Sequence, residues 1–320
     1  AQVLFQLPLF RRLGYSLVPH FGFSNPDFRR VMKQWLPVLA TSSVFTVNQQ
    51  VAFLLASGLE TGSASSLSYA LVFFQLPFGI FSASITTVLF PRMSKQAGKD
   101  DTEGLQESIQ YGIRFLLMTL IPSAFVLSIL GNEIISVALF RGQFDLQANL
   151  LTGKVLTAYA IGLFSVGSFN FLQRFFYSIH NYKLPFFFFI CVAVVNITFS
   201  LWLNENYLRV VALALANTIA FTIGFIVSIS VARKKLGGIR VKPVLVTFVK
   251  VVISSVIAVF ILFVIKEVFG AWWQQGSTFL GFGILLVEGI LALGIILGMY
   301  YLLKVDIFIN IIERKKKHEK

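Results

Sequence analysis

Long apolar runs alternate with short polar stretches along most of the chain. Each run has about 20 residues with few charges, which is the length of an α-helix that crosses a bilayer. Between residues 133 and 149 apolar and polar residues mix, which favours an amphipathic loop lying at the membrane interface. The pattern predicts an all-α polytopic membrane protein with eight transmembrane helices, at 35–58, 64–90, 109–130, 150–174, 184–203, 208–232, 243–265 and 277–303.

The composition supports this interpretation. The chain is 56% hydrophobic and 13% charged, whereas soluble domains carry about 25% charged residues. A net charge of +13 would also be compatible with nucleic-acid binding. The basic residues, however, are grouped between the apolar runs, which is typical of a topology signal. We therefore expect membrane lipids and no nucleic acid as partners.

The basic residues also predict the orientation. Twenty Lys and Arg residues lie on one side of the predicted membrane and three on the other, so the richer side is predicted to be cytoplasmic, together with the C-terminus. The three on the poorer side are Arg141, Arg209 and Lys266.

The first ten residues are too short to span and lack the features of a signal peptide. We expect residues 1–10 to be the end of a truncated preceding helix, so that the chain is the C-terminal part of a longer bacterial inner-membrane protein. The remaining organisation is predicted as a cytoplasmic loop at 11–34, a six-helix lobe at 35–232, two additional helices at 243–303 and a basic cytoplasmic tail at 304–320.

Polar side chains inside apolar runs are candidates for function because they are costly in hydrocarbon. Asn48, Gln49 and Gln50 are consecutive and turn through about 200° of helix, so they cannot all face one partner. At least one is expected to face a polar cavity, although interhelical hydrogen bonds alone are an equal alternative.

The second run contains Gln75, Pro77 and Gly79. Proline removes one backbone hydrogen bond, so the helix is predicted to kink or unwind near Phe73–Pro77. Such a break lets a helix bend during alternating access and present its backbone to a substrate, although proline kinks also occur in purely structural spans.

Glu288 lies near the middle of the last span and is predicted to face protein rather than lipid. Lys250, in the preceding span, is expected either to meet Glu288 or to extend to the cytoplasmic face.

No catalytic or metal-binding pattern accompanies these residues. Cys191 is the only cysteine, and the three histidines form no ligand cluster, so neither a metal site nor another cofactor is expected. We also find no Ser/His/Asp set, paired carboxylates or nucleotide-binding loop, and predict that the chain is not an enzyme. A transporter without an ATP site would draw its energy from an ion gradient or the membrane potential.

Four stretches resemble the MurJ/MviN lipid II flippase family of the multidrug/oligosaccharidyl-lipid/polysaccharide exporter superfamily. They are "QLPLFRRLGY" at 6–15, "VNQQVAFLLASGLETGSASSLSYALVFFQLPFGIFSASITTVLFPRMS" at 47–94, "LFRGQFD" at 139–145 and "RFFYSIHNYKLP" at 174–185. The likeness extends over essentially the whole chain and is weakest in the last two spans.

The resemblance implies two six-helix lobes plus two extra C-terminal helices, with the present spans as helices seven to fourteen. It also implies a flippase that holds the headgroup of an undecaprenyl-pyrophosphate-linked oligosaccharide in a cavity between the lobes, including the missing N-terminal lobe, with the lipid tail in a groove formed by the two extra helices. The candidates for the cavity are Asn48, Gln49, Ser68 and Gln75, with Arg92 and Arg174 as phosphate contacts or lipid anchors; those for the groove are Lys250 and Glu288.

The chain departs from the family pattern at several charged positions. An Asp-Arg pair and a following Glu are replaced by Leu71, Val72 and Gln75, and acidic residues expected elsewhere match Ala52 and Asn181. Two alternatives therefore remain: an exporter of another lipid-linked saccharide or amphiphile, and a non-transporting scaffold or partial gene product. A membrane enzyme acting on a lipid phosphate would need clustered carboxylates or histidines, which we do not find in the sequence.

Overall fold

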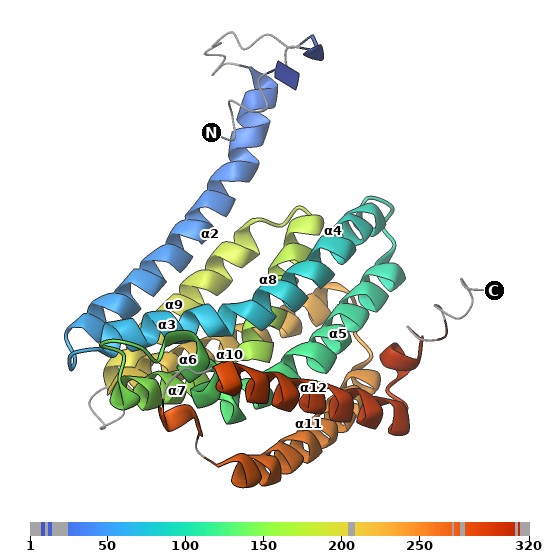
Figure 1. Ribbon diagram of the computed structural model, residues 1–320. Helices are drawn as coiled ribbons and strands as arrows, with labels where there is room; N and C mark the ends of the chain where they lie inside the picture. Colours follow the sequence, from blue (N-terminus) through green and yellow to red (C-terminus); the bar gives the residue numbers. More distant parts are fainter. Residues whose placement is uncertain are drawn as a thin grey trace.

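The computed structural model describes residues 8, 9, 12–14, 25–203, 209–270, 272–275, 279–310 and 313. Within these ranges the regular elements are all helices (Figure 1). Seven helices are long and apolar enough to cross a membrane, and a bent pair of helices at 146–178 can supply an eighth span. The prediction of an all-α polytopic membrane protein is confirmed.

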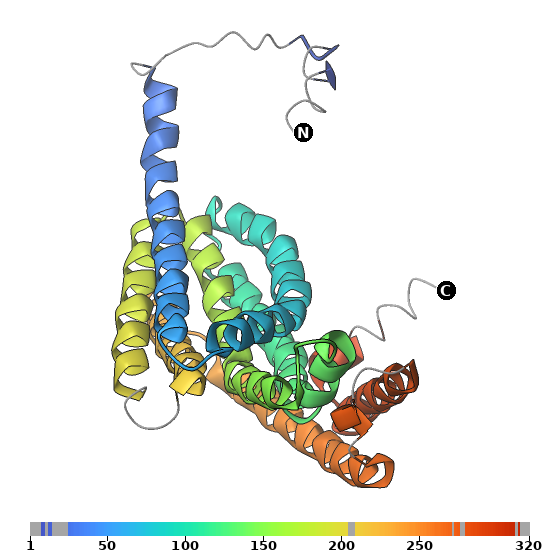
Figure 2. The same cartoon turned by 60° about the vertical axis from the view of Figure 1, so that its left-hand side comes forward.

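The first span is longer than predicted. Helix α2 runs from Pro26 to Ser57, so residues 26–34 are helical rather than part of a loop. The Asn25 side chain accepts a hydrogen bond from the Asp27 N–H at 2.8 Å, and Pro26 suits the first helical position. The beginning of α2 projects away from the other helices in both views (Figures 1 and 2).

The second span is broken, as predicted, but later than predicted. Helix α3 (Ser63–Pro77) is followed by a π-helical turn, η1 (Phe78–Ser82), and by α4 (Ala83–Ala97). Pro77 has no N–H for the carbonyl one turn earlier, and the wider turn that follows it absorbs the mismatch. Figure 2 shows the path curving between α3 and α4.

The segment predicted as an interfacial loop at 133–149 contains a helix instead. After α5 (Thr102–Ile129), the short helix α6 (Gly131–Leu139) buries Ile135 and Ser136. The next helix begins at Leu146, where the Asp145 carboxylate accepts a hydrogen bond from the Ala148 N–H at 2.9 Å. The prediction failed because tertiary packing stabilises a helix of nine residues that would be marginal alone.

The span predicted at 150–174 consists of α7 (Leu146–Ile161) and α8 (Leu163–Ser178), which meet at an angle of 47°. Between them, a Cβ on Gly162 would lie 2.6 Å from Thr218 Oγ1 in α10 (Arg209–Lys235), so only glycine allows this approach. Thr218 Oγ1 donates a hydrogen bond to the Ala158 carbonyl at 2.8 Å, which satisfies an acceptor at the end of α7.

The centre of the bundle is aromatic. Its largest fully buried side chains are in α8 and α10, namely Phe169, Phe171, Phe175, Phe176 and Phe221. Around them lie the helices already named and α9 (Lys183–Leu203). The outer surface carries large apolar side chains, including Leu54 and Leu280 at 72% and 74% exposure. This distribution fits a surface that faces lipid rather than water.

Two further helices follow, with a 3₁₀ turn, η3 (Trp272–Gln275), between them (Figure 1). Helix α11 (Val241–Phe269) packs against α5, and α12 (Phe279–Leu302) packs against α11. The start of the segment predicted as a basic cytoplasmic tail packs against the helices. Val305 and Ile307 are buried, and Tyr300 makes an edge-to-face contact with the Phe308 ring.

Candidate functional site

A polar cavity of about 430 Å³ opens between α2, α3, η1 and helices α7 to α10. Aromatic rings form much of its wall, including Phe74, Phe78 and Tyr159. None of its described lining residues is charged. The polar groups of the cavity are mainly six carboxamides: Asn48, Gln49, Gln75, Asn170, Asn196 and Asn217.

Three of the predicted cavity residues lie in this lining, namely Asn48, Gln49 and Gln75. Asn48 is buried and Gln49 is half-buried, whereas the next residue, Gln50, is exposed and lies outside the lining. The three consecutive side chains therefore do not all face one partner, as expected. The Asn196 Nδ2 atom donates a hydrogen bond to Asn48 Oδ1 at 3.1 Å. Asn48 therefore both bonds to a neighbouring helix and lines the cavity.

Ser68 does not line this cavity. Its hydroxyl donates a hydrogen bond to the Ala64 carbonyl at 2.9 Å, within its own helix. Three further residues of the lining were not predicted from the sequence: Asn170, Asn196 and Asn217. Each is a single asparagine in an apolar run, which is the same signal that identified Asn48.

A second hollow, of about 590 Å³, adjoins the first and shares Phe78 and Asn170 with it. Arg174 lines this second hollow and lies 5.9 Å from the centroid of the Tyr177 ring. Arg92 is exposed and lines neither hollow, so of the two predicted arginines only Arg174 carries its charge next to the cavity.

An apolar groove of about 480 Å³ runs between α5 and α12. Its few polar groups are satisfied within the protein: Tyr300 Oη donates to the Met118 carbonyl at 2.7 Å, and Ser123 Oγ donates to the Thr119 carbonyl at 2.7 Å. The groove therefore presents an almost entirely apolar surface. Its walls come from α5 and α12, whereas the resemblance implied the two additional helices, α11 and α12.

The broken turn after α3 separates the cavity from the groove. Phe78 and Gly79 line the polar cavity, and Pro77 and Phe81 line the apolar groove. Residues that alternate between the two sides of one turn thus contact both spaces. The predicted kink residues, Pro77 and Gly79, lie on opposite sides of this shared wall.

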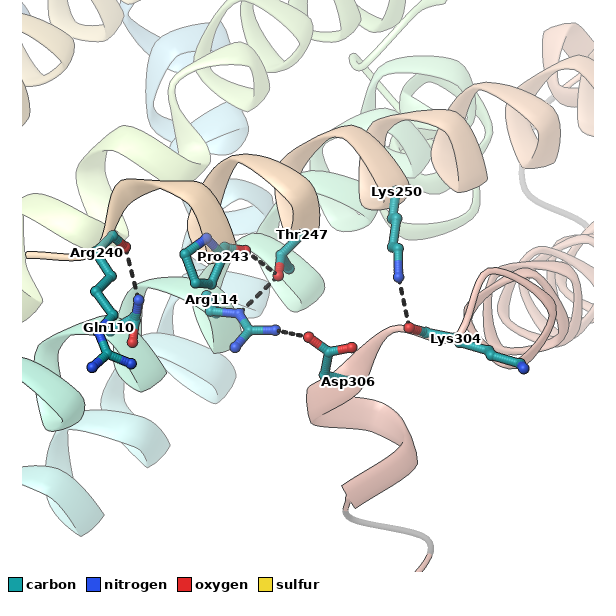
Figure 3. Close-up of polar contacts among 8 residues, drawn as sticks. All are labelled: Gln110, Arg114, Arg240, Pro243, Thr247, Lys250, Lys304 and Asp306. Atoms are coloured by element: carbon teal, nitrogen blue, oxygen red, sulfur yellow. Dashed lines mark hydrogen bonds and ion pairs between the residues drawn. The ribbon is translucent and has the colours of Figure 1, made fainter.

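Polar contacts attach α11 and the segment after α12 to α5 (Figure 3). Arg114 Nε donates to Thr247 Oγ1 at 2.8 Å, and Arg114 Nη2 lies 2.8 Å from Asp306 Oδ2. Nearby, Lys250 Nζ donates to the Lys304 carbonyl at 2.8 Å. These contacts hold one end of the groove-forming helices in place.

The two predicted groove residues, Lys250 and Glu288, do not line the groove. Glu288 is fully buried, which confirms that it faces protein. The charged groups that act on it are Glu133 and Lys266, not Lys250. Of the two alternatives for Lys250, pairing with Glu288 is therefore wrong, because the register of α11 against α12 places a different lysine near the carboxylate.

The positions that depart from the family pattern fall in two environments. Leu71 and Ala52 line the cavity, which explains why its surface carries no charge there. Val72 is 57% exposed, and Asn181 Oδ1 accepts a hydrogen bond from the Leu184 N–H at 3.3 Å at the start of α9.

A polytopic helical bundle with a polar cavity beside an apolar groove is an architecture that also occurs in membrane transporters. The sequence matches the family described as "Lipid II flippase MurJ" over residues 1–283, and the chain belongs to this family. It is 32% identical to a probable lipid II flippase MurJ from Borreliella burgdorferi over 94% of this chain, and 26% identical to one from Rickettsia prowazekii over 95% of it.

Comparison with solved structures gives the same family. A structure of lipid II flippase MurJ in an inward closed conformation aligns with a TM-score of 0.71 and 26% identity over 93% of this chain. A transporter of the MOP superfamily from Pyrococcus furiosus aligns with a TM-score of 0.57 at 13% identity, which shows a shared fold. The chain spans 59% and 60% of the two relatives named above and 57% of the MurJ structure.

Proposed function

We propose that the protein translocates a lipid-linked peptidoglycan precursor, lipid II, across the cytoplasmic membrane by alternating access. Membership of the MurJ family supports this function. The observation that carries the proposal is the shared wall formed by Pro77 to Phe81, with a polar cavity on one side and an apolar groove on the other. An amphiphile can place its headgroup and its tail on the two sides of this wall.

The chemistry of the cavity favours the neutral part of such a headgroup. Carboxamides both donate and accept hydrogen bonds, which suits sugar hydroxyls and acetamido groups. Aromatic walls add apolar contact for the faces of the sugar rings. The cavity therefore supports binding of a saccharide through hydrogen bonds rather than through charge.

A phosphate would lie closer to Arg174, in the adjoining hollow, because a guanidinium binds phosphate oxygens well. In this proposal the remaining cations for a pyrophosphate come from a second lobe, as in the two-lobe arrangement that the resemblance implies. Arg92, which lines neither hollow, anchors the end of α4 to anionic lipid headgroups.

The orientation in the membrane is part of the proposal. The connections that carry most of the Lys and Arg residues, including α4–α5, α8–α9 and α10–α11, lie on the cytoplasmic side, together with the C-terminus. The headgroup would then enter from the side where Arg174 lies, at the end of α8.

Depleting the protein from its own cells, followed by analysis of lipid-linked precursors, tests this function. We expect lipid II to accumulate with its headgroup on the cytoplasmic side. Accumulation of another lipid-linked saccharide would instead support the exporter of a different substrate, which the uncharged cavity favours as the second candidate. If no precursor accumulates, the transport function is wrong and a scaffold role is supported.

A further inference from the structure

A largely buried ionic cluster lies where α12 packs against α11 and α6, outside both the cavity and the groove; the side chain of its lysine, Lys266, is 25% exposed. Lys266 Nζ lies 2.6 Å from Glu133 Oε1, and the Glu133 side chain is only 1% exposed. Lys266 Nζ also donates a hydrogen bond to the Ile129 carbonyl at 2.7 Å. The lysine thus already has two partners, and one of them neutralises its charge.

Glu288 of α12 is the third member of this cluster. It is 0% exposed, and neither of its carboxylate oxygens has a hydrogen-bond partner. The charges acting on it are the Glu133 carboxylate from α6 and the Lys266 ammonium from α11. The facing end of α5, at 118–130, contributes no charged residue, and Glu267, next to Lys266, is exposed.

The cluster therefore contains one carboxylate more than its ammonium can neutralise. A second ionised carboxylate would be a buried charge without a partner, which is strongly unfavourable in a medium of low polarity. Among the described acidic residues, only Glu133 and Glu288 are buried, so the imbalance is confined to this place.

We propose that Glu288 is a proton-binding site, whose carboxyl group takes up one proton from solvent when α12 docks on α6 and α11. A metal cation fits less well, because the Lys266 ammonium already occupies the position beside Glu133 and would repel it. In addition, the described residues contain no group of three or more His, Cys, Asp or Glu side chains that could hold a metal.

Protonation of Glu288 also bears on the apolar groove, because α12, which carries Glu288, forms one wall of that groove. Ala292 and Ile296 line that groove from the same helix as Glu288. If docking of α12 takes up a proton, then loss of the proton favours its separation from α6 and α11, by thermodynamic linkage. This coupling does not depend on which molecule the groove accepts.

One ion pair drawn in Figure 3 lacks this imbalance. There, the Arg114 guanidinium pairs with the Asp306 carboxylate, one charge against one, and the Asp306 side chain is 61% exposed. The Arg114–Asp306 pair is therefore stable with both side chains ionised, whereas the cluster at Glu288 needs a bound proton to balance its charges.

Infrared spectroscopy of the purified protein in detergent micelles at neutral pH tests the proposal. We expect a C=O stretch from a protonated carboxylic acid, which disappears in Glu288→Gln and persists in the exposed control Glu267→Gln. Lys266→Met should increase the band about twofold, because two buried carboxylates then lack a cation. Absence of the band in the wild type, or its persistence in Glu288→Gln, would overturn the proposal.

Thermal unfolding provides a second measurement that needs no assignment of bands. The folded state holds one proton more than the unfolded state between the pH at which an exposed glutamate ionises and the pH at which Glu288 ionises. Across this window the melting temperature of the wild type should fall as the pH rises. Glu288→Gln, which mimics the neutral carboxyl, should remove this dependence, and Glu267→Gln should keep it. A wild type and a Glu288→Gln variant with the same pH dependence would contradict the proposal.

Discussion

Replacing Thr218 with valine should destabilise the protein by about 2 kcal/mol. Thr218 is buried, and its hydroxyl donates to the Ala158 carbonyl at 2.8 Å. The Gly162 N–H, which would otherwise reach Ala158, bonds to the Tyr159 carbonyl at 2.9 Å instead, because the helix breaks there. Valine has the shape of threonine without the donor, so a buried acceptor is left unsatisfied, at a cost of about 1–3 kcal/mol.

Reversible unfolding in mixed micelles, with increasing denaturing detergent, measures this loss. Thr157→Val is the matched control, because Thr157 Oγ1 donates at 3.0 Å to the Gly153 carbonyl within its own helix, where a backbone N–H also bonds to that carbonyl. We expect the control to lose less than about 1 kcal/mol. Equal losses in the two variants would refute the idea that Thr218 satisfies the break between α7 and α8.

Two further predictions concern single side chains. Arg114→Gln should destabilise the protein by about 1–2 kcal/mol and Asp306→Asn by less than about 1 kcal/mol, because Arg114 also bonds to Thr247 and is only 15% exposed; equal effects in the same unfolding assay would contradict this. Gln75→Ala should reduce rescue of a flippase-depleted strain, whereas Cys191→Ala, outside the cavity lining, should not; full rescue by Gln75→Ala would remove Gln75 from the site.

The membrane spans could be predicted because the length of an apolar run directly reflects the thickness of a bilayer. The polar cavity was partly predictable for a related reason: an amide such as Asn48 is costly in hydrocarbon and needs a polar environment. The break after Pro77 follows from the missing N–H of proline, although its position one turn later depends on how the helix repacks.

Features that depend on contacts between distant helices could not be predicted. Gly162 gave no signal of a break, because the bend depends on the approach of Thr218 from α10. Lys250 was considered as a partner of Glu288 and Lys266 was not, because sequence depth alone does not give the register of two packed helices. Glu133 was assigned to a loop, and its burial depends on the packing of α6 against α7 and α12.

The central claim is that a lipid tail occupies the groove while its headgroup crosses through the cavity. Gly289 lines the groove, and a Cβ there would meet no atom within 4 Å, so a side chain at this position can start into the groove without a clash at its Cβ. Gly294, on the same helix, is equally open and does not line the groove. This pair provides a matched comparison.

The most direct measurement is the rate at which lipid II headgroups become accessible on the outer face of the membrane, in cells where this protein is the only flippase. We expect Gly289→Trp to abolish this exposure and Gly294→Trp, present at the same level in the membrane, to preserve it. Equal rates of exposure in the two variants would show that the groove does not hold the lipid tail during transport.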